Sequence, residues 1–334
     1  MATAISARLA CHLALAALAA GGCSPAPRGR IVVAITIDWE GAYLSPDGLD
    51  ALDEIRRSLD PAPMTHFVSA AYFTKDRPDP KAAATIAQEV RKGDELAVHL
   101  HAWRSLARAS RIEPRLSPSF LTGTDKLLEF EDGDLGFDTD LDAYSVTDLR
   151  VLVRTSRRLL EELHLPVSAT FRAGGYLGTP KVLQAIRAEG FAVDCSATDH
   201  RQIDEHKDEV LPRRLQAIWP GVEPTSQPWS IDAPGDAARG SLLEMPIAAF
   251  ADYTTPAEIV AVFEAAHARL HDDPRRDVFV VVGFHQETAQ DFAGRLRDAL
   301  DQVRGRREIA DELMFTTVAD AAARARRTVA RPPS

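Results

Sequence analysis

The stretch Ile31-Val32-Val33-Ala34-Ile35-Thr36-Ile37-Asp38-Trp39-Glu40-Gly41 decides the fold class. It begins with a continuous apolar run rich in β-branched side chains, which is typical of a strand buried on both faces. Strands of that kind belong to parallel sheets that carry helices on both sides. Two carboxylates, Asp38 and Glu40, follow at the end of this predicted strand.

Short runs of the same kind recur along the chain and alternate with helical stretches. We expect further strands at 64–69, 95–99, 167–171, 191–194, 242–246, 278–284 and 313–317. Helices are expected at about 48–59, 80–92, 147–163, 179–189, 256–271, 289–304 and 317–327. This alternation predicts the α/β class, and so many units favour a distorted parallel (β/α) barrel of about seven strands over an open sheet.

The length of 334 residues suits one barrel domain, since α/β barrels of roughly 200–250 residues occur as single units. We expect the domain over 30–327 and a tail over 328–334. Two segments interrupt the alternation, at about 104–146 and 197–240, and we interpret both as inserts. The formal net charge of −10 disfavours nonspecific binding to nucleic acid, so no nucleic-acid partner is expected.

Residues 1–22 resemble a bacterial signal peptide. Arg8 supplies a positive charge, and the apolar run from Leu9 to Ala20 is too short to span a bilayer. Ala20-Gly21-Gly22-Cys23 then resembles a lipobox, although Ala20 stands where that motif usually has leucine. We therefore expect export, lipidation at Cys23 and a short linker over 23–29, with the protein periplasmic or anchored to a bacterial membrane. Cleavage of an ordinary signal near Ala20 is the alternative.

Cysteine usage agrees with this prediction. Cys11 leaves with the signal peptide, and a lipidated Cys23 has no free thiol. Cys195 is then the remaining thiol, so no intramolecular disulfide is expected.

Polar side chains follow the predicted strands at the end where parallel barrels place their active sites. Asp38 and Glu40 are two residues apart, so in extended backbone both point to one side. His99 and His101 have the same spacing at the end of another strand, and a His-x-His pair is a good bidentate platform for a divalent metal. We predict one divalent ion, zinc, held by Glu40, His99 and His101. Whether Asp38 replaces Glu40 as a ligand stays open.

Taken together, these strand ends resemble the NodB-homology domain of polysaccharide deacetylases, carbohydrate esterase family 4, over roughly residues 30–320. Thr36-Ile37-Asp38-Trp39-Glu40-Gly41 is similar to the first family motif, which implies that Asp38 is the general base and Glu40 a metal ligand. Lys92-Gly93-Asp94-Glu95-Leu96-Ala97-Val98-His99 resembles the start of the family's histidine motif. That motif has a second histidine four residues later, where this chain has Trp103. His101 is the nearest substitute.

Three further roles come from the resemblance. Phe171-Arg172-Ala173-Gly174-Gly175-Tyr176 is similar to the motif whose arginine orients the base, which implies that role for Arg172. The resemblance implies that His285 is the general acid and that Asp194 supports it.

The resemblance implies a metal-dependent hydrolase that removes N- or O-acetyl groups from a cell-envelope or exported polysaccharide. Two alternatives stay open: a non-catalytic carbohydrate-binding protein of the same fold, and a hydrolase of non-sugar amide bonds. The missing second histidine favours the first alternative, and the retained Asp38, Arg172, Asp194 and His285 count against it. Trp219 and Trp229, in the second insert, either stack on sugar rings or pack the insert itself.

Overall fold

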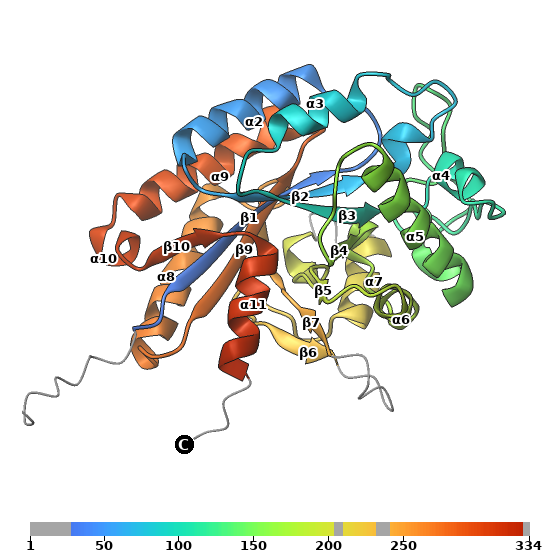
Figure 1. The fold of residues 1–334 in the computed structure, drawn as a ribbon. Helices are drawn as coiled ribbons and strands as arrows, with labels where there is room; N and C mark the ends of the chain where they lie inside the picture. Colours follow the sequence, from blue (N-terminus) through green and yellow to red (C-terminus); the bar gives the residue numbers. More distant parts are fainter. Residues whose placement is uncertain (1–27, 204–209, 232–240, 330–334) are drawn as a thin grey trace, which may run out of the picture.

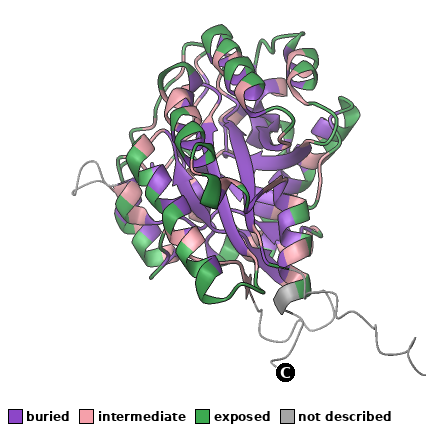
Figure 2. Cartoon of the chain, turned by 90° about the vertical axis from the view of Figure 1, so that its left-hand side faces the viewer, coloured by how far each residue is buried: buried purple, intermediate pink, exposed green. Residues whose placement is uncertain are grey.

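The structure is a computed structural model that describes residues 28–203, 210–231 and 241–329. The predicted signal peptide and Cys23 lie outside these residues. Figure 1 shows a curled sheet at the centre of the molecule, with helices packed around it. Figure 2 shows the strands as the buried centre, while the helices carry exposed residues on their outer faces.

The sheet has ten strands in the order β6-β7-β5-β4-β3-β2-β1-β9-β8, with β10 beside β1. Among the described strands, neighbours are parallel except for the antiparallel pair of β6 and β7. The strands are β1 (Ile31–Trp39), β2 (Met64–Ser69), β3 (Glu95–Leu100), β4 (Thr170–Ala173), β5 (Val193–Asp194), β6 (Trp229–Ile231), β7 (Leu242–Glu244), β8 (Ile247–Phe250), β9 (Val278–His285) and β10 (Leu313–Thr316).

Helices connect most of these strands and cover the outer face of the sheet. The α-helices are α2 (Pro46–Leu59), α3 (Ala82–Glu89), α4 (Arg104–Ala109), α5 (Val146–Glu162), α6 (Pro180–Ala188), α7 (Val210–Ile218), α8 (Pro256–Asp272), α9 (Ala289–Arg304), α10 (Arg307–Ala310) and α11 (Val318–Val329). Short 3-10 helices are η1 (Ala70–Phe73), η2 (Leu141–Ala143), η3 (Gly174–Tyr176) and η4 (His200–Gln202).

The strand β1 divides two apolar cores. Ile31, Val33, Ile35 and Ile37 pack against the outer helices, because alternate side chains of a strand point to opposite faces. Val32 and Ala34 belong to the inner core, which also receives side chains from α7 and α11. Thr36 and Asp38 continue this inner row and are fully buried. The inner row therefore changes from apolar to polar at the carboxyl end of the strand.

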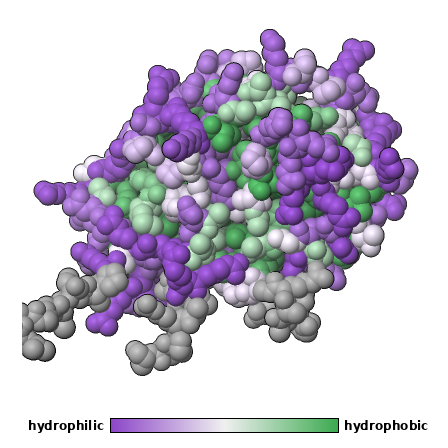
Figure 3. Space-filling model, in the orientation of Figure 1, coloured by the Kyte–Doolittle hydropathy of each residue, from purple (hydrophilic) through white to green (hydrophobic). Residues whose placement is uncertain are grey.

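The helix α11 covers the inner core near the amino ends of the strands. Its backbone N–H groups at Val318 and Ala319 donate to Thr65 Oγ1 and Glu95 Oε2, each at 2.9 Å. These bonds satisfy donors that a helix start otherwise leaves unpaired. No described helix is both long and apolar enough to cross a membrane. The face in Figure 3 is mainly hydrophilic, with smaller hydrophobic areas between.

The predicted parallel α/β barrel is confirmed, and most predicted strands and helices lie within a few residues of their expected places. The sheet has more strands than the expected seven, because short strands flank the main ones. The prediction missed β8, since Pro246 was taken as the end of a single strand over 242–246. It also missed β6, α4 and α7, which lie inside the two segments interpreted as inserts.

Candidate active site

The carboxyl ends of neighbouring strands bring the predicted site residues together. Asp38 of β1 is in register with His285 of β9, and His99 lies in β3, two strands from β1. Glu40 and His101 each follow directly after their strand. All five side chains are therefore at one end of the barrel, which is where parallel barrels place their chemistry.

Glu40, His99 and His101 form a tight cluster. Oε2 of Glu40 lies 3.3 Å from Nε2 of His99 and also contacts Nε2 of His101. The other ring nitrogens, Nδ1, lie 3.1 Å from the carbonyl oxygen of Arg172 and 2.6 Å from that of Phe137, respectively. A carbonyl only accepts hydrogen bonds, so Nδ1 of each ring carries the proton. In the neutral rings Nε2 is therefore the nitrogen free to bind an ion, and both Nε2 atoms face the same carboxylate.

The electrostatics of this cluster suit a bound cation. Burial disfavours the charged carboxylate, but His101 and His99 hold the pKa of Glu40 well below its usual value. Burial likewise disfavours a charged imidazole, yet Glu40 and Asp38 raise the pKa of His99. Nε2 of His101 is buried, and its contact with Oε2 of Glu40 lacks hydrogen-bond geometry. A metal ion beside these two atoms would satisfy the nitrogen.

Arg172 holds Asp38 at the edge of this cluster. Nη1 of Arg172 lies 2.5 Å from Oδ1 of Asp38, and both side chains are fully buried. Nε of the same guanidinium donates to the carbonyl oxygen of Cys195 at 2.8 Å, which fixes the direction of the fork. Burial opposes a charged guanidinium, but Asp38 raises the pKa of Arg172. Oδ2 of Asp38 has no hydrogen-bond partner, so one carboxylate oxygen remains open.

His285 lies on the other side of Glu40. Nε2 of His285 is 3.2 Å from Oε1 of Glu40, and Nδ1 is 3.0 Å from Oδ1 of Asp252. Burial favours the neutral ring, yet the carboxylates of Asp252, Glu40 and Asp38 raise the pKa of His285 to about 10. Asp252 also accepts from the backbone N–H of His285 at 3.2 Å. Asp252 therefore fixes both the position and the protonation of this ring.

The structure places Asp252, not Asp194, beside His285. Val193 and Cys195 pack in the inner core, so alternation along the chain turns Asp194 to the opposite face. There Asp194 is in register with Glu244 of β7 and accepts from Ser196 Oγ at 2.7 Å. Burial raises the pKa of Asp194 to about 6, and it raises that of Glu244 well above its usual value.

Sequence reasoning missed Asp252 and gave no role to Glu287. Asp252 follows β8, so the missed strand also concealed the carboxylate after it. Glu287 is two residues beyond His285, and its carboxylate accepts from the backbone N–H of Glu40 at 3.1 Å and from Tyr72 Oη at 2.5 Å. Burial and the nearby Glu40 raise the pKa of Glu287 to about 7. Glu287 therefore anchors the backbone of Glu40.

The tryptophans have packing roles. Trp103 occupies the position of the absent histidine, and its Nε1 donates to the carbonyl oxygen of Glu40 at 2.9 Å. Trp219 is buried, packs against Trp229 and donates from Nε1 to the carbonyl oxygen of Tyr176 at 2.9 Å. Of the two interpretations of Trp219 and Trp229, the structure supports packing.

A cavity of about 660 Å³ opens above the cluster. Glu40, His285 and Asp252 contribute to its lining. Its walls include five aromatic side chains, those of Tyr43, Phe130, Phe137, Tyr253 and Phe292, and Arg295 lies at one side. A substrate in this cavity would have an apolar surface around a few convergent polar groups, as in most small-molecule sites.

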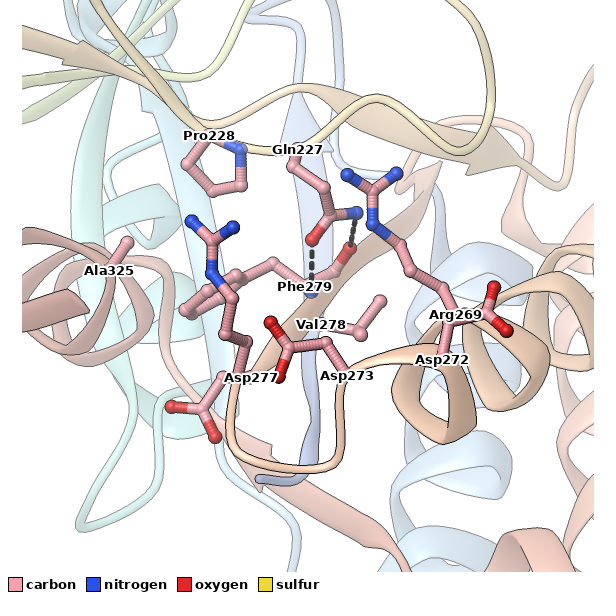
Figure 4. A pocket seen from close by; sticks show the side chains of 10 residues that line it. Gln227, Pro228, Arg269, Asp272, Asp273, Asp277, Val278, Phe279 and Ala325 are labelled. Atoms are coloured by element: carbon pink, nitrogen blue, oxygen red, sulfur yellow. Dashed lines mark hydrogen bonds between the residues drawn. The ribbon is translucent and has the colours of Figure 1, made fainter. Parts of the chain in front are cut away.

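Another cavity, of about 260 Å³, lies at the amino ends of the strands (Figure 4). Gln227 closes one side of it, because its side-chain amide forms two hydrogen bonds with the backbone of Phe279, at 2.9 and 3.2 Å. Figure 4 shows Asp272, Asp273 and Arg269 around it, with no histidine among the lining residues. Val278 and Phe279 begin β9 and His285 ends it, so this cavity is at the opposite end of the barrel from the candidate active site.

Comparison with solved structures gives similar folds. A protein described as a polysaccharide deacetylase from Mycobacterium smegmatis has a TM-score of 0.52 and 17% identity, over 92% of this chain and 94% of that one. A structure titled Puue Allantoinase also has a TM-score of 0.52, with 13% identity over 93% of this chain and 97% of that one. No protein-family model and no curated protein sequence matches the chain. The predicted NodB-like barrel is thus confirmed as the fold.

Proposed function

We propose that the protein is a metal-dependent deacetylase that removes acetyl groups from a carbohydrate. The observation that supports this most is the convergence of His99 Nε2 and His101 Nε2 on the Glu40 carboxylate, with both Nδ1 atoms held by backbone carbonyls. Two imidazoles and one carboxylate are the protein ligands of many catalytic zinc sites. Glu40, His99 and His101 would hold the ion, and we propose zinc.

A zinc ion in this position would polarise the acyl carbonyl and lower the pKa of a bound water. The protein's own residues then divide the proton transfers. Asp38 takes a proton from the attacking water through its open Oδ2, while Arg172 holds Oδ1 and keeps the carboxylate in place. His285 donates a proton to the leaving amine or alkoxide from Nε2, and Asp252 holds the Nδ1 proton.

The aromatic cavity supports a carbohydrate as substrate, since the faces of sugar rings pack on aromatic side chains. The exposed ring of Tyr43 and the partly buried Phe130 and Phe292 could receive such a ring beside Glu40. With export predicted from residues 1–23, a cell-envelope or exported polysaccharide is the proposed substrate class. The similarity to the allantoinase structure and the apolar cavity keep a non-sugar amide as the second candidate.

The test combines metal analysis with acetate release. Purified protein should contain zinc, one equivalent of it at Glu40, His99 and His101, and release acetate from a panel of acetylated polysaccharides. His99→Ala should contain one equivalent of zinc less than the wild type and should lose the activity. Comparing Glu40→Gln with Asp38→Asn identifies the carboxylate that binds the metal. The variant at the ligand loses metal, whereas the variant at the general base retains metal but loses turnover. A protein that binds the oligosaccharide but releases no acetate would be a carbohydrate-binding protein, and acetate release that survives His99→Ala would contradict the proposed mechanism.

A further inference from the structure

A second cluster of imidazole and carboxylate groups lies at the amino ends of the strands. His267 and His271 are one turn apart on α8, so their rings share a face of the helix, with centroids 4.4 Å apart. Glu312 directly precedes β10, and its side chain is 8% exposed. Since Leu313 of β10 is in register with Ile31, the first residue of β1, this cluster is remote from Glu40.

Both imidazoles point a ring nitrogen at the same carboxylate. Nδ1 of His267 lies 2.8 Å from Oε2 of Glu312, and Nε2 of His271 lies 3.3 Å from Oε1. The three ligand atoms lie within 4.8 Å of one another, which is close enough to share one ion. Two imidazoles and a carboxylate are the donor types that zinc and its neighbours in the transition series prefer.

The surroundings leave room to complete a coordination shell. A cavity of about 430 Å³ adjoins the cluster, and Glu308 and Asp311 line it together with Arg28 and Arg30. Nη2 of Arg28 now lies 2.7 Å from Oε1 of Glu312, but its side chain is 63% exposed and can turn into solvent. Water could then occupy the remaining positions around an ion.

We propose that His267, His271 and Glu312 bind one divalent transition-metal ion of the zinc type, in a site separate from the active site. Such an ion would join the last turns of α8 to the segment that leads into β10. Figure 1 shows α8 and α10 on the same side of the sheet, so the ion would link neighbouring elements rather than distort them. A ligand that binds only the folded state raises the melting temperature, and this site should do so.

The experiment isolates this site from the proposed catalytic one. The full chain, without a histidine tag, is prepared as His99→Ala/His101→Ala, stripped with a chelator and equilibrated with Zn²⁺. We expect one zinc per chain by elemental analysis and a melting temperature that rises with zinc. Adding His271→Ala, an exposed position, should remove both effects. Adding His200→Ala instead, at a partly exposed histidine elsewhere, should retain both.

Two results would overturn the proposal: no zinc bound by the double variant, or zinc that remains after His271→Ala. Glu312→Gln in the double variant provides a second check. It should also remove the bound zinc, because it removes the charge but keeps the size of the side chain. The variant with His271→Ala as its single substitution should keep its acetate release, since the site lies away from Glu40. Failure of the catalytic proposal would appear separately, as an absence of any difference in zinc content between wild type and His99→Ala/His101→Ala.

Discussion

The side chains at the candidate active site are held by backbone atoms of several distant segments. His99 is oriented by the carbonyl of Arg172, and His101 by that of Phe137 in the first insert. At Glu40 the roles are reversed, since its backbone N–H donates to the side-chain carboxylate of Glu287. Contacts of this kind fix tautomers and ring directions, and they make each ligand sensitive to changes at residues that never touch a metal.

Gly174 is such a position. A Cβ added there would lie 2.6 Å from three ring atoms of His101, which is too close for a real contact. Gly174→Ala should therefore displace the buried imidazole, cost about 1–3 kcal/mol of stability through overpacking, and lower zinc affinity. Zinc content and the free energy of unfolding check this. Gly294→Ala, where φ lies outside the left-handed region and the added Cβ would be 3.7 Å from its nearest neighbour, is the control for an altered glycine, and equal zinc loss in both variants would contradict the argument.

The pair of His285 and Asp252 gives a second prediction at this scale. His285→Ala should lower turnover by about 10²–10⁴ with zinc content intact, because a general acid–base group is lost. The loss should be larger for amides than for activated aryl esters, whose leaving groups need no proton. Asp252→Asn should give a smaller loss in the same direction, since Asp252 holds Nδ1. Asp194→Asn is the matched control, and a loss of turnover there equal to that of Asp252→Asn would contradict the assignment.

At the scale of elements, β5 and β7 meet through two buried acids. Asp194 and Glu244 are in register, Oδ2 of the first and Oε2 of the second have no hydrogen-bond partner, and Ser196 and Ala197 donate backbone N–H groups to Glu244. Two carboxylates this close share a proton more readily than they both ionise. The junction of these two strands should therefore depend on pH.

The sign of this dependence follows from the raised pKa values of both acids. Between the unfolded value of about 4 and the folded value of about 6 for Asp194, the folded protein binds more protons than the unfolded chain. Stability from this pair is therefore present at low pH and falls as pH rises, by up to about 1.4 kcal/mol per pH unit per proton. Asp194→Asn lacks this loss, so the free energy of unfolding of the variant minus that of the wild type should be larger at pH 8 than at pH 5. Urea unfolding at both pH values measures this, and parallel pH profiles for the two proteins would refute it.

At the scale of the whole molecule, the cavity and the start of the domain lie at opposite ends of the barrel. The aromatic cavity surrounds the carboxyl ends of the strands. Gly29, just before β1, donates its backbone N–H to the carbonyl oxygen of Pro274 at 2.8 Å, at the amino ends. If Cys23 carries a lipid, a short linker would therefore leave the cavity facing away from the membrane.

Lipidation is tested by mass spectrometry of the mature N-terminus, where we expect a lipid-modified Cys23. Cys23→Ser should move the protein from the membrane fraction to the soluble exported fraction while acetate release from a soluble substrate stays unchanged, because the anchor lies away from the cavity. A mature terminus without lipid at another residue would leave an ordinary cleaved signal near Ala20 as the correct alternative.

The sequence by itself determined the α/β barrel and most of the candidate metal cluster. Periodicity is local, so the apolar run before Asp38 predicted a buried parallel strand. The two-residue spacing of His99 and His101 also predicted their common direction, because that direction depends on backbone geometry alone. The same reasoning applied to Glu40, whose carboxylate meets both imidazoles.

Only the tertiary structure decided which residues from separate strands meet. Asp194 and Asp252 both stand near strand ends, but one faces outward to Glu244 and the other reaches His285. Which face a residue takes depends on where its strand begins and on how strands bend, as at the irregular register between β8 and β9. Such pairings join segments far apart in the chain, so the packing of the whole sheet sets them, and no local spacing contains that information.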